Sequence, residues 1–151
     1  MRAGIEVAGI KEILKEFSRL GPDLNKEVRV SSKRIAEDEV PRLKAAANRS
    51  DRLSAAVGIT VRARSDRVPQ IIAGGAKRIA VSTKPKAGEV FFGAEFGGGM
   101  RKSTRQFRPH RGRKGYWFWP QIRDDEQRMV KEWMEALERV LEDQSMIDRG
   151  Q

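Results

Sequence analysis

The first third of the chain has its apolar residues at helical spacing. Over residues 10–20 they recur every three or four positions, with charged residues on the opposite side. These apolar residues are Ile10, Ile13, Leu14, Phe17 and Leu20. Gly21 and Pro22 follow, and such a pair typically ends a helix. We therefore predict one helix over residues 10–20 and another over 23–48, with a kink or a junction of two helices at Pro41.

The middle of the chain changes to an alternating pattern. From Leu53 onwards, apolar and polar residues alternate in the manner of a strand with one buried face. The apolar members are Val57, Ile59, Val61 and Ala63. Further short strands are expected over residues 70–73, 78–82 and 89–92, because turn-forming Gly and Pro residues separate these segments. Together these strands predict a central antiparallel sheet.

The last third combines an aromatic cluster with a strongly patterned helix. Residues 116–119 read Tyr-Trp-Phe-Trp and are expected to form the last strand, with one alternate pair in the core and the other at a subunit interface. Residues 120–143 predict a helix, because Pro120 suits a first turn and the acids at 124–126 suit a helix N-terminus. Its apolar stripe is Ile122, Met129, Val130, Trp133, Leu137, Val140 and Leu141.

Strands grouped together, rather than alternating with helices, indicate an α+β fold. The chain has 151 residues, which suits a single domain. Within that domain we expect helices over residues 1–50, strands with a long basic loop (97–115) over 53–119, and an amphipathic helix over 120–145. A loop of that length is unusual in a compact domain, where such loops are either functional or disordered.

The net charge of +10 is distributed unevenly. Residues 99–119 hold seven basic and no acidic side chains, whereas residues 121–151 hold nine acidic and five basic ones. The seven are Arg101, Lys102, Arg105, Arg108, Arg111, Arg113 and Lys114. They fit a solvated loop, contacts to DNA, or contacts to the acidic face of a neighbouring copy that bears Glu135, Glu138 and Glu142. We favour inter-subunit contacts, with DNA contact for Arg62, Arg64 and part of the loop.

The sequence shows no recognisable grouping of catalytic residues. The chain has no cysteine, and its one histidine, His110, lies between arginines with no carboxylate partner nearby in the sequence. No Gly-Lys-Ser/Thr phosphate loop occurs. We therefore expect no enzymatic activity, no cofactor and no metal. No apolar run reaches the length of a membrane span, and the N-terminus lacks a signal-peptide core, so assembly in the cytoplasm is expected.

Residues 94–120 contain three short elements in a distinctive order. They are Ala94-Glu95-Phe96-Gly97, Gln106-Phe107-Arg108-Pro109 and Gly115-Tyr116-Trp117-Phe118-Trp119-Pro120. This series, followed by a helix, resembles the tail-completion and head–tail connector (neck) proteins of lambdoid-type siphophages. The resemblance is specific over residues 88–142 and only architectural over residues 1–87. The loop is richer in arginine than the family pattern.

The resemblance implies a structural virion protein that acts as a neck, tail-completion or tail-terminator subunit. Six or twelve copies would form a ring that joins head to tail around the DNA channel, beside other neck, connector and tail-tube proteins. Interface or channel contacts are then expected at Phe96, Arg101, Lys102, Arg105, Phe107, Arg108, Arg111, Arg113, Lys114, Trp117 and Trp119. The alternative is a stand-alone basic nucleic-acid-binding protein, which the pI of about 10.4 favours.

Overall fold

The computed structural model describes residues 2–4, 10–19, 21–98 and 107–150. Its helices and strands, in chain order, are β1 (Arg2–Gly4), α1 (Ile10–Arg19), α2 (Pro22–Ser50), α3 (Arg52–Gly58), β2 (Arg62–Arg64), β3 (Gln70–Ile72), α4 (Ala87–Phe96), the 3-10 helix η1 (Gly112–Lys114) and α5 (Phe118–Arg149). The fold is α+β, as the sequence predicts, and mostly helical.

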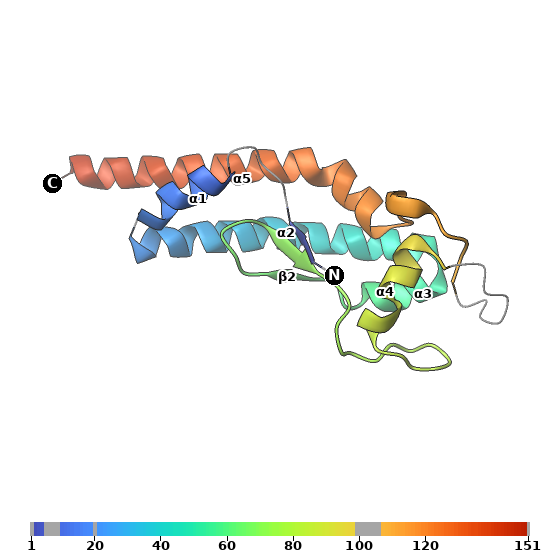
Figure 1. The fold of residues 1–151 in the computed structure, drawn as a ribbon. Helices are drawn as coiled ribbons and strands as arrows, with labels where there is room; N and C mark the ends of the chain where they lie inside the picture. Colours follow the sequence, from blue (N-terminus) through green and yellow to red (C-terminus); the bar gives the residue numbers. More distant parts are fainter. Residues whose placement is uncertain (1, 5–9, 20, 99–106, 151) are drawn as a thin grey trace.

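The long helices α2 and α5 lie side by side and run in opposite directions (Figure 1). Their facing sides supply much of the core, with Ile35 and Leu43 from α2 and Leu137 from α5 all buried. Trp133 of α5 is fully buried, and its indole N–H donates to Ser32 Oγ at 3.1 Å and to the Arg67 carbonyl at 2.9 Å. These contacts follow from the amphipathic stripes on both helices, which bury apolar area against each other.

A small antiparallel sheet packs beside α2. Its strand order is β1-β3-β2, with Ala3 and Ala63 both paired to Ile71. Ile71 is buried, whereas Arg62 and Arg64 on β2 are exposed. The sheet contacts α2 through β2 and β3. It therefore covers α2 without forming the large central sheet that the alternating pattern predicts.

Two segments predicted as strands are helical. Residues 52–58 form α3, because the Asp51 carboxylate accepts the Ser54 N–H at 2.8 Å and so caps a helix N-terminus. In the described structure, three residues of the predicted alternating segment form a strand, namely those of β2. Residues 89–92 lie in α4, where the Glu89 carboxylate accepts the Lys86 N–H at 3.1 Å at the start of the helix.

Other predicted boundaries also change. Residues 78–82 contribute a single bridge, between Arg78 and Lys86, and no strand. α2 continues through Pro41 as one helix, so a junction of two helices there is wrong. Residues 116–119 are not a strand, because α5 already begins at Phe118. The predicted C-terminal helix is confirmed and extends to Arg149.

Candidate assembly site

A buried carboxylate joins the first and third elements of the sequence motif. Glu95 of α4 has no exposed surface. Its Oε2 accepts the N–H groups of Phe118 at 2.8 Å and Trp117 at 3.3 Å, and its Oε1 accepts that of Trp119 at 3.1 Å. Backbone N–H groups at a helix N-terminus have no partner within the helix. Glu95 therefore caps α5 from a different helix.

Opposing effects act on the pKa of the Glu95 carboxyl. Burial raises the pKa of the Glu95 carboxyl, while the three backbone donors and nearby Arg123 act in the other direction. The Arg123 guanidinium also donates to the carbonyls of Arg113 at 2.7 Å and Lys114 at 2.9 Å. η1 is thereby attached to the first turns of α5, beside the cap.

Position 115 must be a glycine because the Glu95 carboxylate lies directly beside it. Its φ is +76°, and a Cβ at this position would overlap Glu95 Oε1. The next residue, Tyr116, donates its N–H to the Glu95 carbonyl at 2.7 Å. The glycine at the start of the third element thus lets the chain pass directly over the carboxylate.

The second element packs onto the first. The Phe107 ring lies so close to Gly93 that a Cβ there would overlap it. The Gly98 N–H donates to the Arg108 carbonyl at 2.8 Å, and the Arg111 N–H donates to the Phe96 carbonyl at 2.8 Å. Residues 107–111 therefore run along the end of α4 in a defined conformation.

The Arg108 side chain makes its polar contacts with residues of its own chain. Its Nε lies 2.9 Å from Asp51 Oδ2, and its NH2 donates to Ser50 Oγ at 2.8 Å. The guanidinium carbon is 3.7 Å from the centre of the Tyr116 ring, whose hydroxyl donates to the Pro109 carbonyl at 2.6 Å. We predicted Arg108 as a contact to a neighbour or to DNA, but here it joins α2 and α3 to the motif.

The aromatic run divides differently from the predicted alternation. Trp117 and Phe118 are consecutive and both buried, because the chain turns into α5 between them. Their rings lie 5.9 Å and 5.4 Å from the ring of Phe91 on α4. Tyr116 and Trp119 are half-buried. Trp117, predicted at an interface or in the core, is a core residue of this chain.

The remaining predicted contact residues fall into three groups. Arg111, Arg113 and Lys114 are exposed, and Phe96 and Phe107 are half-buried. Arg101, Lys102 and Arg105 lie outside the described residues, as does Gln106 of the motif. His110 is exposed, and its Nδ1 accepts the Gly112 N–H at 3.3 Å.

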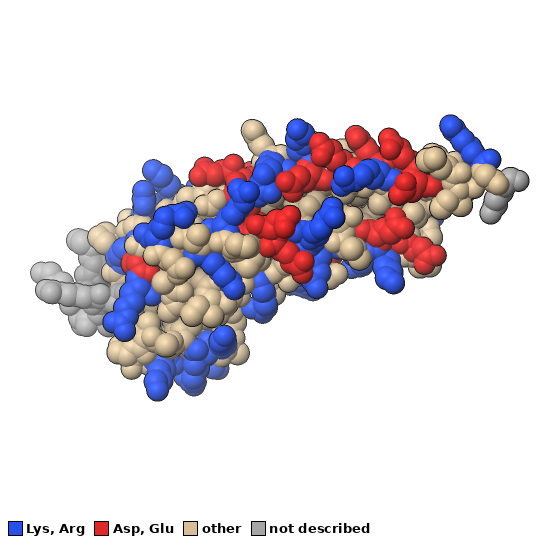
Figure 2. All heavy atoms as spheres, turned by 180° about the vertical axis from the view of Figure 1, so that it is seen from behind, with Lys and Arg blue, Asp and Glu red and all other residues tan. Residues whose placement is uncertain are grey.

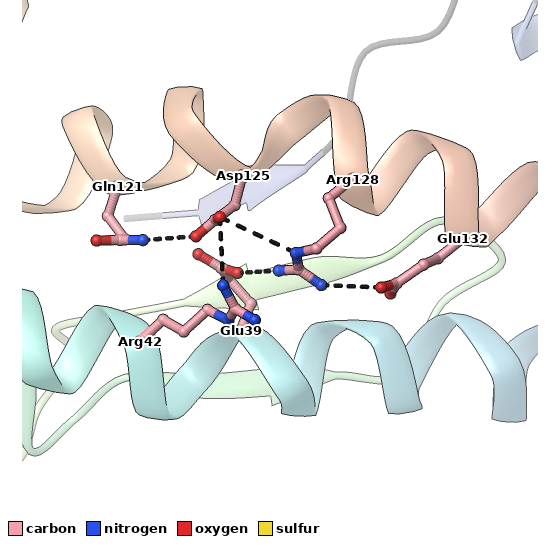
Figure 3. Close-up of polar contacts among 6 residues, drawn as sticks. All are labelled: Glu39, Arg42, Gln121, Asp125, Arg128 and Glu132. Atoms are coloured by element: carbon pink, nitrogen blue, oxygen red, sulfur yellow. Dashed lines mark hydrogen bonds and ion pairs between the residues drawn. The ribbon is translucent and has the colours of Figure 1, made fainter.

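A second polar cluster, which the sequence analysis missed, lies between α2 and α5 (Figure 3). Glu39 is fully buried, and its Oε2 is 2.6 Å from Arg128 NH2. Arg128 NH1 contacts Glu132 at 3.1 Å, and Arg42 contacts Asp125 at 3.5 Å. The sequence did contain a signal that Glu39 is buried. Residues 32, 35, 39 and 43 follow the helical spacing of the buried stripe of α2, so Glu39 falls on the apolar face.

Burial raises the pKa of Glu39 to about 8, and neighbouring Asp125 adds to the effect. The ion pair with Arg128 and the charge of Arg42 lower the pKa but do not outweigh burial. A carboxyl with a raised pKa keeps its proton in the folded state after the unfolded chain has lost it. The stability it contributes is complete below pH 4.5 and is lost as the pH rises to about 8.

We accordingly expect the free energy of unfolding to fall by on the order of 3 kcal/mol between pH 5 and pH 8.5. The Glu39→Gln variant cannot ionise at this position and should lose most of that dependence. Urea unfolding of both chains at the two pH values measures the difference. Equal pH dependence in both chains would show that Glu39 does not titrate in this window.

Within the described part of the chain, no helix is long and apolar enough to cross a membrane. Nor do the described residues contain a group of three or more His, Cys, Asp or Glu side chains able to hold a metal ion. The arrangement around Glu95 is one of caps, ion pairs and close backbone contacts, which fix a surface in place. Comparison with protein-family models, with curated proteins and with solved structures gives no match.

Proposed function

We propose that this chain is a structural subunit of a tailed-phage virion that joins head to tail around the DNA channel. One observation carries the proposal. The elements that resemble the neck and tail-completion family are not scattered over the fold but converge on Glu95 and the end of α4. The described parts of all three elements contact one another there. A motif that builds one rigid region is expected where a protein must present a fixed surface.

The surface around this region suits assembly. Arg111, Arg113 and Lys114 project outward from a backbone that is fixed by hydrogen bonds to α4 and α5. A rigid backbone lowers the entropy lost when exposed side chains bind a partner. The proposal assigns this region to contacts with copies of the chain and with neighbouring neck, connector and tail-tube proteins, in a ring of six or twelve copies.

The proposal places the chain in the virion, at the head–tail junction, after assembly in the host cytoplasm. Arg62 and Arg64 are exposed on β2 and extend the basic surface beyond the motif. In a channel these side chains would make weak, sequence-independent contacts with the phosphates of passing DNA. Such contacts allow DNA to slide, which a neck channel requires.

Deleting the gene from the phage that encodes this chain tests the proposal. We expect electron micrographs of the lysate to show separate heads and tails, and infectivity to fall by several orders of magnitude. Supplying the chain from a plasmid should restore joined particles. Supplying the His110→Ala variant should restore them equally, because His110 is exposed and its side chain makes one hydrogen bond, with Gly112 of its own loop. Infectious particles from the deletion phage alone would overturn the proposal.

A further inference from the structure

The outward face of α5 carries an acidic stripe near the C-terminus. Glu135, Glu138 and Glu142 are exposed and lie three or four residues apart, on the side of α5 opposite Trp133 and Val140. We call these three residues the acidic stripe. Figure 2 shows acidic side chains gathered along the elongated part of the molecule, towards the end that carries the C-terminus. The exposed apolar side chains of Leu141 and Met146 lie beside it.

A basic and aromatic surface lies at the other end of the molecule. It consists of Phe92, Phe96, Arg111, Arg113 and Lys114, and we call it the basic patch. Phe92 is 58% exposed and stacks on Phe96 at 6.2 Å. The Phe96 carbonyl accepts the Arg111 N–H, which places Arg111 beside the aromatic pair, and η1, which carries Arg113 and Lys114, contacts α4. Residues 107–115 contain no acidic side chain.

Among the described residues, none of the three cations of the basic patch forms an ion pair, although the Arg111 guanidinium lies 5.0 Å from the centre of the Tyr116 ring. Glu95 is buried and bonded to the N-terminus of α5. Asp51 pairs with Arg108, which is not part of the patch. The positive charge of the patch is therefore left for a partner.

The stripe and the patch are too far apart to meet within one copy. Arg123 of α5 holds the carbonyls of the patch residues Arg113 and Lys114. From Arg123 to Glu138 a helix rises about 22 Å, at 1.5 Å per residue. α5 is helical over this whole distance and thus keeps the two surfaces apart. Within one copy, Glu135 of the stripe already pairs with Lys131 at 4.0 Å, but such an exposed ion pair contributes little stability. The stripe and the patch can therefore meet only across a contact between molecules.

We propose that the basic patch of one copy binds the acidic stripe of the next. The charges are opposite, and the exposed Phe92 is available to pack against Met146, as aromatic residues do at interface cores. Because two different surfaces meet, the contact is head-to-tail and repeats around a ring if the rotation closes. This inference rests on the proposed function in one respect, namely that the ring is the one at the head–tail junction.

Charge reversal tests the contact on the full chain. The stripe variant carries Glu135→Lys, Glu138→Lys and Glu142→Lys, and the patch variant carries Arg111→Glu, Arg113→Glu and Lys114→Glu. Sedimentation velocity at low salt should show the unmodified chain self-associating and each variant associating at least ~100-fold more weakly. An equimolar mixture of the two variants should regain association, because each then offers the surface that the other needs.

A matched control for the stripe variant carries Glu12→Lys, Glu27→Lys and Asp38→Lys, which reverse three exposed acids on α1 and α2 and change the net charge by the same amount as the stripe variant. It should associate like the unmodified chain, and circular dichroism should show all the chains folded. The inference fails if either variant associates normally, if the mixture does not recover, or if the unmodified chain is monomeric at every concentration. None of these results touches the role at the head–tail junction, which the gene deletion tests separately.

Discussion

A Glu95→Ala chain is expected to unfold with a free energy about 4 kcal/mol smaller than that of the unmodified chain. The change leaves three backbone N–H groups at the start of α5, those of Trp117, Phe118 and Trp119, without their acceptor. Each buried donor left unpaired costs ~1–3 kcal/mol, and the space vacated by the side chain adds to the loss. Water that enters the vacated space can accept from these N–H groups and so recovers part of the lost free energy. Urea unfolding, followed by tryptophan fluorescence, measures the difference.

Glu89→Ala provides the control for this prediction. Glu89 is also a glutamate of α4, but it is exposed and accepts the single Lys86 N–H at 3.1 Å. Its loss should cost about 1 kcal/mol, as for other helix caps on the surface. If Glu95→Ala cost no more than Glu89→Ala, the carboxylate would not be holding α4 and α5 together.

A Gly97→Ala chain is expected to lose about 3 kcal/mol or more. Gly97 has φ +79° and ψ 177°, a backbone conformation found almost entirely in glycine. A Cβ there would also overlap the Pro109 carbonyl, which belongs to a neighbouring backbone segment and cannot rotate away. The expected result is a lower unfolding midpoint in urea and a weakened contact between residues 97–98 and 108–109.

The Gly112→Ala variant separates the cost of the backbone conformation from the cost of the overlap with Pro109. Gly112 also has a positive φ, +68°, but no atom lies within 4 Å of the place where its Cβ would be. This change should therefore cost only the ~1–2 kcal/mol of a left-handed residue. Equal losses in the two variants would mean that the close approach of Pro109 contributes nothing.

Helices with a strong amphipathic stripe were predictable from the sequence. α1, α2 and α5 each bury one face, and their apolar spacing marks that face directly. α4 was missed because its residues, among them Val90, Phe91 and Ala94, are nearly all apolar or small and show little periodicity. α3 was missed because the alternation after Leu53 was given more weight than the capping residue Asp51, whose carboxylate decides the local structure.

The composition of the site was predictable, but its geometry was not. The sequence identifies Glu95, Gly115 and the aromatic run as a motif. It does not indicate that a carboxylate on one helix reaches backbone donors 22 to 24 residues later. The same limit applies to Arg108, whose partner Asp51 is far away along the chain. Six basic residues remain predicted contacts. Three are exposed, namely Arg111, Arg113 and Lys114. The other three, Arg101, Lys102 and Arg105, lie outside the described residues.

The central claim is that this chain joins heads to tails. The most direct measurement adds the purified chain to a lysate of the deletion phage and counts joined particles by electron microscopy. We predict separate heads and tails before the addition, and joined, infectious particles after it. Heads and tails that stay separate after the folded chain is added, or that are already joined without it, would contradict the claim.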